Sequence, residues 1–166
     1  MMLSSGAMGE GISDWSRFER LTPFRVRDVL LVASHFDHYL LEESGYLAEI
    51  MQEEYSDLNL SQAPRIIHSP DARDALRLLR AREFDLVITM ARVGEMDVKA
   101  FGTEAKRVIE GLPVVMLSHN TRELATLSAG DGIDRIFVWT GDSRILLSIC
   151  KLLEDERNVE NDVRDG

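Results

Sequence analysis

Five short apolar runs, separated by segments of helical periodicity, constrain the fold of this chain more than any other feature. The runs cover residues 28–33, 65–68, 84–89, 113–118 and 134–139. Most are apolar at both alternate sets of positions, which is typical of strands buried on both faces of a parallel sheet. Connections between parallel strands are right-handed and place helices on both faces of the sheet. We therefore predict an α/β fold with a doubly wound, five-stranded parallel sheet.

The segments between these runs repeat apolar residues every three or four positions, as amphipathic helices do. Helices are expected over about residues 37–58, 72–79, 101–109, 120–130 and 143–153. At 166 residues, with 45% hydrophobic content, the chain is long enough for one packed domain. We assign residues 1–25 to a flexible leader with a short amphipathic helix, residues 26–155 to the domain, and residues 156–166 to a polar tail or linker.

Charge and cysteine content narrow the classes of partner. The formal net charge of −10 repels nucleic acid and anionic membrane surfaces, so neither is expected as a partner. No apolar run approaches the roughly 20 residues that span a bilayer. Cys150 is the only cysteine and lies in an apolar helical pattern, which excludes a disulfide framework and favours a cytoplasmic location.

Ligands of doubly wound sheets bind beyond the carboxyl ends of the strands, so the residues that follow the strands are the candidate site. Three of these neighbourhoods resemble the receiver domains of bacterial two-component response regulators. Residues 84–97 resemble the third strand and the loop after it, residues 112–118 the fourth strand, and residues 132–139 the fifth. The resemblance covers residues 26–155. It implies the receiver or flavodoxin-like three-layer sandwich, with strand order 2-1-3-4-5 and helices on both faces.

In this chain, other residues stand at most of the positions that carry the chemistry of receiver domains. Met90 stands at the position of the phospho-accepting aspartate, and Trp139 stands at that of the family's lysine. Ala33 and Ser34 stand where the family has its acidic, Mg²⁺-binding pair, and only Ser118 is retained. A thioether cannot form an acyl phosphate, and a methyl group with a hydroxyl cannot replace two carboxylates for a hard cation. The resemblance thus indicates a degenerate phosphorylation pocket, without metal or cofactor.

From these substitutions we predict a signal-transduction regulatory module that acts by protein-protein contact and is not an enzyme. We expect the substituted side chains to fill the pocket, with Met90 and Trp139 in or near contact. The expected partner is a protein or a covalently attached output domain, such as a kinase. A weaker resemblance to the N-terminal receiver-like segment of phosphoenolpyruvate-synthase-like signalling proteins makes such a portion another candidate, and a second copy of the chain is a third.

Two other functions remain open from the sequence. One is a receiver phosphorylated at a non-standard residue, with Asp97 or Ser118 as the acceptor and His119 as a neighbouring contact. The other is a small-ligand or flavin-binding domain of the same shape, although residues 33–37 lack the glycines of a flavodoxin-like phosphate loop.

The remaining polar patterns have ordinary explanations. His35 and His38 have the spacing of a metal pair, but we interpret them as cap or surface groups because nothing in the sequence adds a second pair. The expected first helix is acidic and the second carries Arg73, Arg77 and Arg80. We interpret the acidic run as a solvated face, and an orienting surface for a partner is the alternative.

Overall fold

The computed structural model describes residues 24–43, 64–119, 122, 130 and 132–165. Two compact units divide the chain: Val26–Cys150 forms one, and residues 1–25 with Lys151–Gly166 form the other. The predicted helix near Trp15, the second half of the predicted helix over residues 37–58, and most of residues 120–130 lie outside the described residues. No helix in the described part of the chain is both long enough and apolar enough to cross a membrane.

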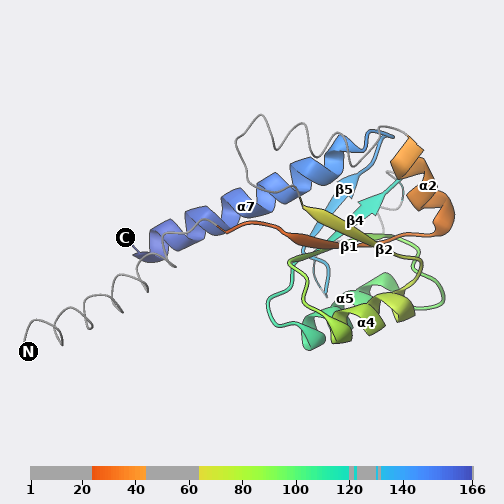
Figure 1. Ribbon diagram of the computed structural model, residues 1–166, viewed down its shortest axis with the longest axis horizontal. Coiled ribbons are helices and arrows are strands. Elements are labelled where there is room, and N and C mark those ends of the chain that lie inside the picture. Colours follow the sequence, from red (N-terminus) through yellow and green to blue (C-terminus); the bar gives the residue numbers. More distant parts are fainter. Residues whose placement is uncertain (1–23, 44–63, 120–121, 123–129, 131, 166) are drawn as a thin grey trace, which may run out of the picture. The chain divides into compact units, whose positions relative to one another are not determined.

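The sheet has the predicted topology. Its five strands are all parallel, in the order β2-β1-β3-β4-β5 (Figure 1). The strands are β1 (Asp28–Val32), β2 (Arg65–Ser69), β3 (Leu86–Met90), β4 (Val114–Ser118) and β5 (Arg135–Val138). The three central strands, β1, β3 and β4, are almost entirely buried, which explains why they read as apolar runs. The fold class and the strand order predicted from the sequence are confirmed.

Helices cover both faces of the sheet (Figure 1). They are α2 (His35–Glu43), α4 (Ala72–Ala81), α5 (Val98–Val108) and α7 (Arg144–Asp165). Figure 1 shows α4 and α5 together on one face, with α2 on the other. Asp71 caps α4 by accepting from Asp74 N at 2.8 Å, and Asp97 caps α5 by accepting from Ala100 N at 3.2 Å. Each cap satisfies a backbone N–H that the helix leaves unpaired.

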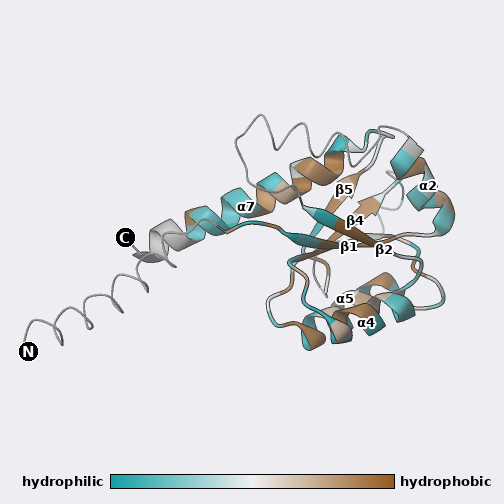
Figure 2. Ribbon diagram, in the orientation of Figure 1, coloured by the Kyte–Doolittle hydropathy of each residue, from teal (hydrophilic) through white to brown (hydrophobic). Residues whose placement is uncertain are grey.

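Alternation along the strands divides the core between the two faces. Leu30, Val87, Val114 and Met116 pack in the cluster that includes Phe101 of α5 and its neighbours on α4. The intervening strand residues face the opposite way, because successive strand side chains alternate between faces. Figure 2 shows β4 and β5 in brown and both colours on α4 and α5, the pattern of apolar strands beside amphipathic helices.

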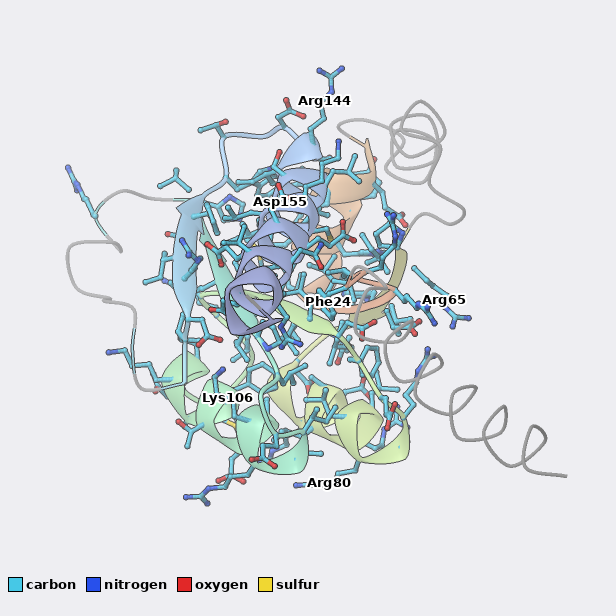
Figure 3. The ribbon with its side chains drawn as sticks, turned by 90° about the vertical axis from the view of Figure 1, so that its left-hand side faces the viewer. Phe24, Arg65, Arg80, Lys106, Arg144 and Asp155 are labelled. Atoms are coloured by element: carbon cyan, nitrogen blue, oxygen red, sulfur yellow. The ribbon has the colours of Figure 1, made fainter. Side chains whose placement is uncertain are left out.

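Lys106 joins α5 to the strands next to it. Figure 3 shows Lys106 on α5, and its Nζ donates to Leu112 O at 2.7 Å and to Asp134 Oδ2 at 2.6 Å. The same Asp134 oxygen accepts from Val114 N at 2.8 Å. One carboxylate therefore holds α5 and the beginnings of β4 and β5 in register.

The structure shifts three predicted boundaries. Helix α2 begins at His35, two residues earlier than predicted, because Ser34 caps it. Strand β3 begins at Leu86, two residues later than predicted, and the carboxylate of Asp85 just before it accepts from the backbone N–H groups of Arg27 and Asp28, both at 2.9 Å. Helix α7 continues to Asp165, whereas the predicted helix ended near residue 153. Residues 156–165 are thus helical, and their role as a linker stays a prediction.

Within the smaller unit, Phe24 contacts the extended part of α7. Its backbone N–H donates to Asn158 Oδ1 at 2.7 Å, and the Arg157 guanidinium lies 4.6 Å from the centre of its ring. A cation over an aromatic face is attractive and is strengthened by partial burial. These contacts join residues 157 and 158 of α7 to Phe24 within this unit.

Candidate functional site

The strand register brings the predicted site residues to one edge of the sheet. Val32 is paired with Thr89, Met90 with Leu117, and Ser118 with Val138. The carboxyl ends of β1, β3, β4 and β5 therefore lie next to one another. The residues at or just beyond these ends are the five predicted from the resemblance: Ala33, Ser34, Met90, Ser118 and Trp139.

Four of these five residues are buried. The exposed fractions are 1% for Ala33, 2% for Met90, 1% for Ser118 and 5% for Trp139, whereas Ser34 is exposed. This burial agrees with the expectation that apolar packing occupies the edge, and the direct Met90–Trp139 contact stays a prediction. A methyl, a thioether and an indole offer no carboxylate at this edge. The residues of the family's Mg²⁺ site therefore do not fit the ion here.

Ser34 caps helix α2 at this edge. Its Oγ accepts from Asp37 N at 3.1 Å and donates to Asp37 Oδ2 at 3.2 Å. A hydroxyl residue followed three positions later by an acid is the pattern of a helix N-cap. Ser34 therefore begins α2, and its position in the first-strand loop serves the helix. The Ser34-to-Asp37 spacing is the sequence signal that would have located this boundary.

Asp37 also binds the loop after β4. Its Oδ1 lies 3.1 Å from His119 Nε2, and the His119 ring lies 4.7 Å from the ring of Trp139 at an interplanar angle of 49°. A continuous set of contacts thus runs from Ser34 through Asp37 and His119 to Trp139. It crosses the edge where the resemblance places the phosphorylation pocket. Sequence reasoning singled out His119 but not Asp37 as its partner, because the two are 82 residues apart.

Trp139 keeps one polar atom without a partner. Among the described side chains, its Nε1 is the buried nitrogen or oxygen that lacks a hydrogen bond. Leaving such a donor unpaired costs about 1–3 kcal/mol. Trp139 therefore contributes to this edge by the size of its ring and by its contact with His119.

We expect the Trp139→Phe variant to lose no more than about 1 kcal/mol of unfolding free energy, because the removed N–H makes no bond and the ring volume is largely kept. Phe137→Leu, at a half-buried position of β5 two residues before Trp139, is the comparison for a loss of side-chain volume without loss of a polar group. Urea denaturation of both variants measures the comparison. A loss for Trp139→Phe much larger than for Phe137→Leu would show that the indole N–H has a partner.

The other candidate residues lie in different settings. Asp97 is exposed and caps α5, and His119 is occupied by Asp37. His38 and His35 lie beside His68 of β2, with the His38 and His68 rings stacked at 3.9 Å. In the regions that the structure describes, no group of three or more His, Cys, Asp or Glu side chains is arranged to hold a metal ion.

Comparison with known proteins identifies the fold. No family model matches the chain, and no curated protein matches it in sequence. Solved structures do match, among them a CheY-like response regulator receiver domain protein from Methanospirillum hungatei JF-1. Its TM-score is 0.61 at 18% identity, over 81% of this chain and 98% of that one. The chain has the receiver-domain fold.

Two further receiver-fold structures differ in how much of their own chain is matched. The signal receiver domain of an HD domain-containing protein from Pseudomonas fluorescens Pf-5 matches with a TM-score of 0.61 at 21% identity, over 85% of this chain and 96% of that chain. NtrX from Brucella abortus matches with a TM-score of 0.63 at 22% identity, over 86% of this chain but only 29% of NtrX. In NtrX the receiver fold is thus part of a longer chain.

Proposed function

We propose that this chain is a signal-transduction regulatory module that acts by protein-protein contact and takes no part in phosphotransfer. The observation that carries the proposal is Met90. Its side chain is buried at the end of β3, the position that the resemblance equates with the phospho-accepting aspartate. Transfer of a phosphoryl group to this position requires a carboxylate nucleophile, and a thioether sulfur does not supply one.

The surroundings of Met90 support the same proposal. Phosphoryl transfer needs positive charge to stabilise the transferred group, normally Mg²⁺ and a cationic side chain. Ala33 supplies no ligand atom, and the Ser34 hydroxyl is engaged with Asp37. Trp139 supplies a neutral N–H in place of an ammonium group. The acceptor and both sources of positive charge are therefore replaced together.

Phosphorylation at another residue is less well supported. Asp97 already accepts from Ala100 N as the cap of α5, and Ser118 is only 1% exposed. Modification of Asp97 would break the cap, and modification of Ser118 would require β4 to open. A flavin-binding role has no structural support either. Residues 33–37, where a phosphate-binding loop would lie, instead form the Ser34 cap and the first turn of α2.

The partner that we propose is a protein, either separate or covalently attached. The match covers only 29% of NtrX, and another matched receiver domain belongs to an HD domain-containing protein, so attachment to further domains is a reasonable model for this chain. A kinase or a phosphoenolpyruvate-synthase-like portion is the candidate that the sequence suggests, and a second copy of the chain is the alternative. A cytoplasmic location belongs to the same proposal.

The proposal is tested by incubating the protein with acetyl phosphate and Mg²⁺ and measuring its intact mass. We expect no phosphoryl adduct and no change in tryptophan fluorescence, because the acceptor and the ion-binding carboxylates are absent. A receiver domain with the full set of active residues, treated in parallel, shows that the reagents work.

A stoichiometric phosphoryl adduct would contradict the proposal. In that case Asp97→Asn and Ser118→Ala would locate it, because each variant removes one of the two alternative acceptors. Asp97→Asn is well suited to this purpose, since asparagine also caps helices and so preserves α5.

A further inference from the structure

Three histidine side chains from two elements meet beside the carboxyl end of β1. His35 and His38 lie in the first turn of α2, and His68 is the fourth residue of β2. The His38 and His68 rings are almost parallel, at 4°, with centres 3.9 Å apart. The His35 ring stands edge-on to His68, with centres 5.6 Å apart. We call these three residues the histidine cluster.

One hydrogen bond fixes which ring nitrogen of His68 carries a proton when the ring is neutral. Its Nε2 lies 2.6 Å from the carbonyl oxygen of Ala33. A carbonyl oxygen only accepts, so Nε2 carries the proton and donates it. In the neutral ring the other nitrogen, Nδ1, is then bare. The packing of His38 on His68 is therefore suited to neutral rings, and a proton added to each ring would place two like charges in contact.

The charged groups around the histidine cluster compensate for such charges only in part. On α2, Glu42 lies 3.4 Å from His38 Nε2, but its side chain is 62% exposed and thus screened by solvent. Asp37 is directed to His119 of the loop after β4. From α4, Asp74 faces His68, although its carboxylate is already engaged by Ser69 and Arg77.

The direction of titration agrees with this geometry. Burial, followed by the nearby His68, lowers the pKa of His38 from its ordinary value, and Glu42 opposes the shift. The hydrogen bond from Arg77, with a second from Ser69, keeps the pKa of Asp74 low, so this acid remains charged and committed to them. Within the folded cluster, His38 therefore resists protonation.

The two ends of α2 are held differently. At its far end, Ser143 Oγ donates to Leu41 O at 2.6 Å, and Leu41 is fully buried. This anchor contains no titratable group. At its near end, α2 meets β2 through the histidine cluster. A change in the charge of the cluster therefore acts on the first turn of α2 while Leu41 stays anchored.

We propose that the histidine cluster is a pH-sensitive contact, and that its protonation in mild acid loosens the first turn of α2 from β2. The contact would give the module a change of state that needs neither phosphate nor metal. It goes beyond the function proposed above and does not depend on it, because it concerns protons at α2 and not the chemistry of Met90.

The sign of the pH dependence follows from the lowered pKa of His38. An unperturbed histidine has a pKa of about 6.5, so the unfolded chain takes up this proton more readily than the folded one. The stabilising effect of the neutral cluster is complete above about pH 6.5 and is lost as the pH falls through the lower folded value.

Hydrogen exchange of the α2 amides tests the proposal. After correction for intrinsic rates, we expect exchange in α2 to rise severalfold as the pH falls from about 7.5 to about 5.5, while exchange in α5 stays unchanged. His38→Gln and His68→Gln should abolish most of this rise. His119→Gln removes the other histidine contact of the first turn of α2, the one with Asp37, and should keep the rise because the cluster itself is intact.

Two results would overturn the proposal. One is exchange in α2 of the wild-type protein that does not change between these pH values. The other is an acid response that persists undiminished in both His38→Gln and His68→Gln. Because these variants also alter packing, an NMR titration of the wild-type histidine rings provides a second measure, and a His38 midpoint at or above the free value would equally refute it.

Discussion

Replacing Met90 by aspartate is expected to lower the unfolding free energy by about 3–4 kcal/mol, and by itself to restore no phosphorylation. Met90 is 2% exposed at the end of a strand buried along its whole length. A carboxylate placed there would lose its hydration, and neither Ala33 nor Trp139 would supply positive charge. The large loss therefore arises because the surrounding residues suit an apolar side chain.

The pH dependence of the Met90→Asp variant gives a second check. Burial raises the pKa of a carboxyl above its unfolded value of about 3.9. The destabilising effect of the new carboxyl is therefore small below about pH 3.9, and it grows as the pH rises through the pKa of this carboxyl in the folded state. Guanidinium denaturation at about pH 5 and pH 7.5 should show the larger loss at the higher pH.

Met90→Leu is the control for this variant, because it conserves volume and introduces no charge. We expect it to cost less than about 1.5 kcal/mol. If Met90→Asp were as stable as Met90→Leu, or if it became phosphorylated with Mg²⁺ bound, the edge would be an open and polar site. The assignment of a packed, inactive pocket would then be wrong.

Replacing Gly102 by alanine is expected to cost about 3 kcal/mol, although alanine is the better helix former. Gly102 lies within α5, where a Cβ atom would overlap the carbonyl oxygen of Gly132 and lie 2.8 Å from its carbonyl carbon. Gly132 has a φ of +94°, so the turn before β5 is itself restricted to glycine. The backbone of α5 and this turn are therefore packed against each other directly.

The sign of the effect decides this prediction. Helix propensity alone would make Gly102→Ala stabilising by about 1 kcal/mol, whereas the backbone overlap makes it destabilising. Gly111→Ala is the comparison, since Gly111 has a φ of +75° with no atom within 4 Å of the added Cβ. It should lose only about 1 kcal/mol, the cost of a left-handed conformation. Thermal or urea denaturation of the two variants measures the difference.

The contacts at the sheet edge suggest how a receiver fold can function without its usual chemistry. An acidic cluster without metal would be a set of repelling, partly desolvated carboxylates, and neutral side chains remove that repulsion. In this chain, Ser34, Asp37, His119 and Trp139 connect α2 to the ends of β4 and β5. A direct connection of this kind favours a regulatory surface defined by packing.

The strands, their order and the identity of the edge residues could all be predicted from the sequence. Strand signals are local, and a strand buried on both faces reads as an apolar run wherever it lies in the chain. The relation of Met90 to the end of β3 was accessible for the same reason, because it depends on a continuous motif. The boundaries were less accurate: the cap formed by Ser34 starts α2 two residues early, and α7 continues to Asp165, well beyond its apolar pattern.

Pairs of side chains from distant segments were not predictable. His119 and Asp37 are 82 residues apart, and the sequence offered a different interpretation for each. The sequence placed His38 in a helix and His68 at a strand end. Neither assignment indicates that the two rings stack. Nor does the apolar periodicity of α5 show that Gly102 packs directly against the backbone of Gly132.

By itself, the sequence determined the layered α/β architecture and, through the resemblance, predicted that a carboxylate, a cation and an acidic pair are replaced in the candidate pocket. Both follow from which residue type stands at which position along the chain. Only the tertiary structure decided which polar groups meet and which stay unpaired: the Asp37–His119 contact, the histidine cluster and the unpaired indole N–H of Trp139. These depend on distances of a few ångströms between elements far apart in sequence, which are set by the packing of the whole domain.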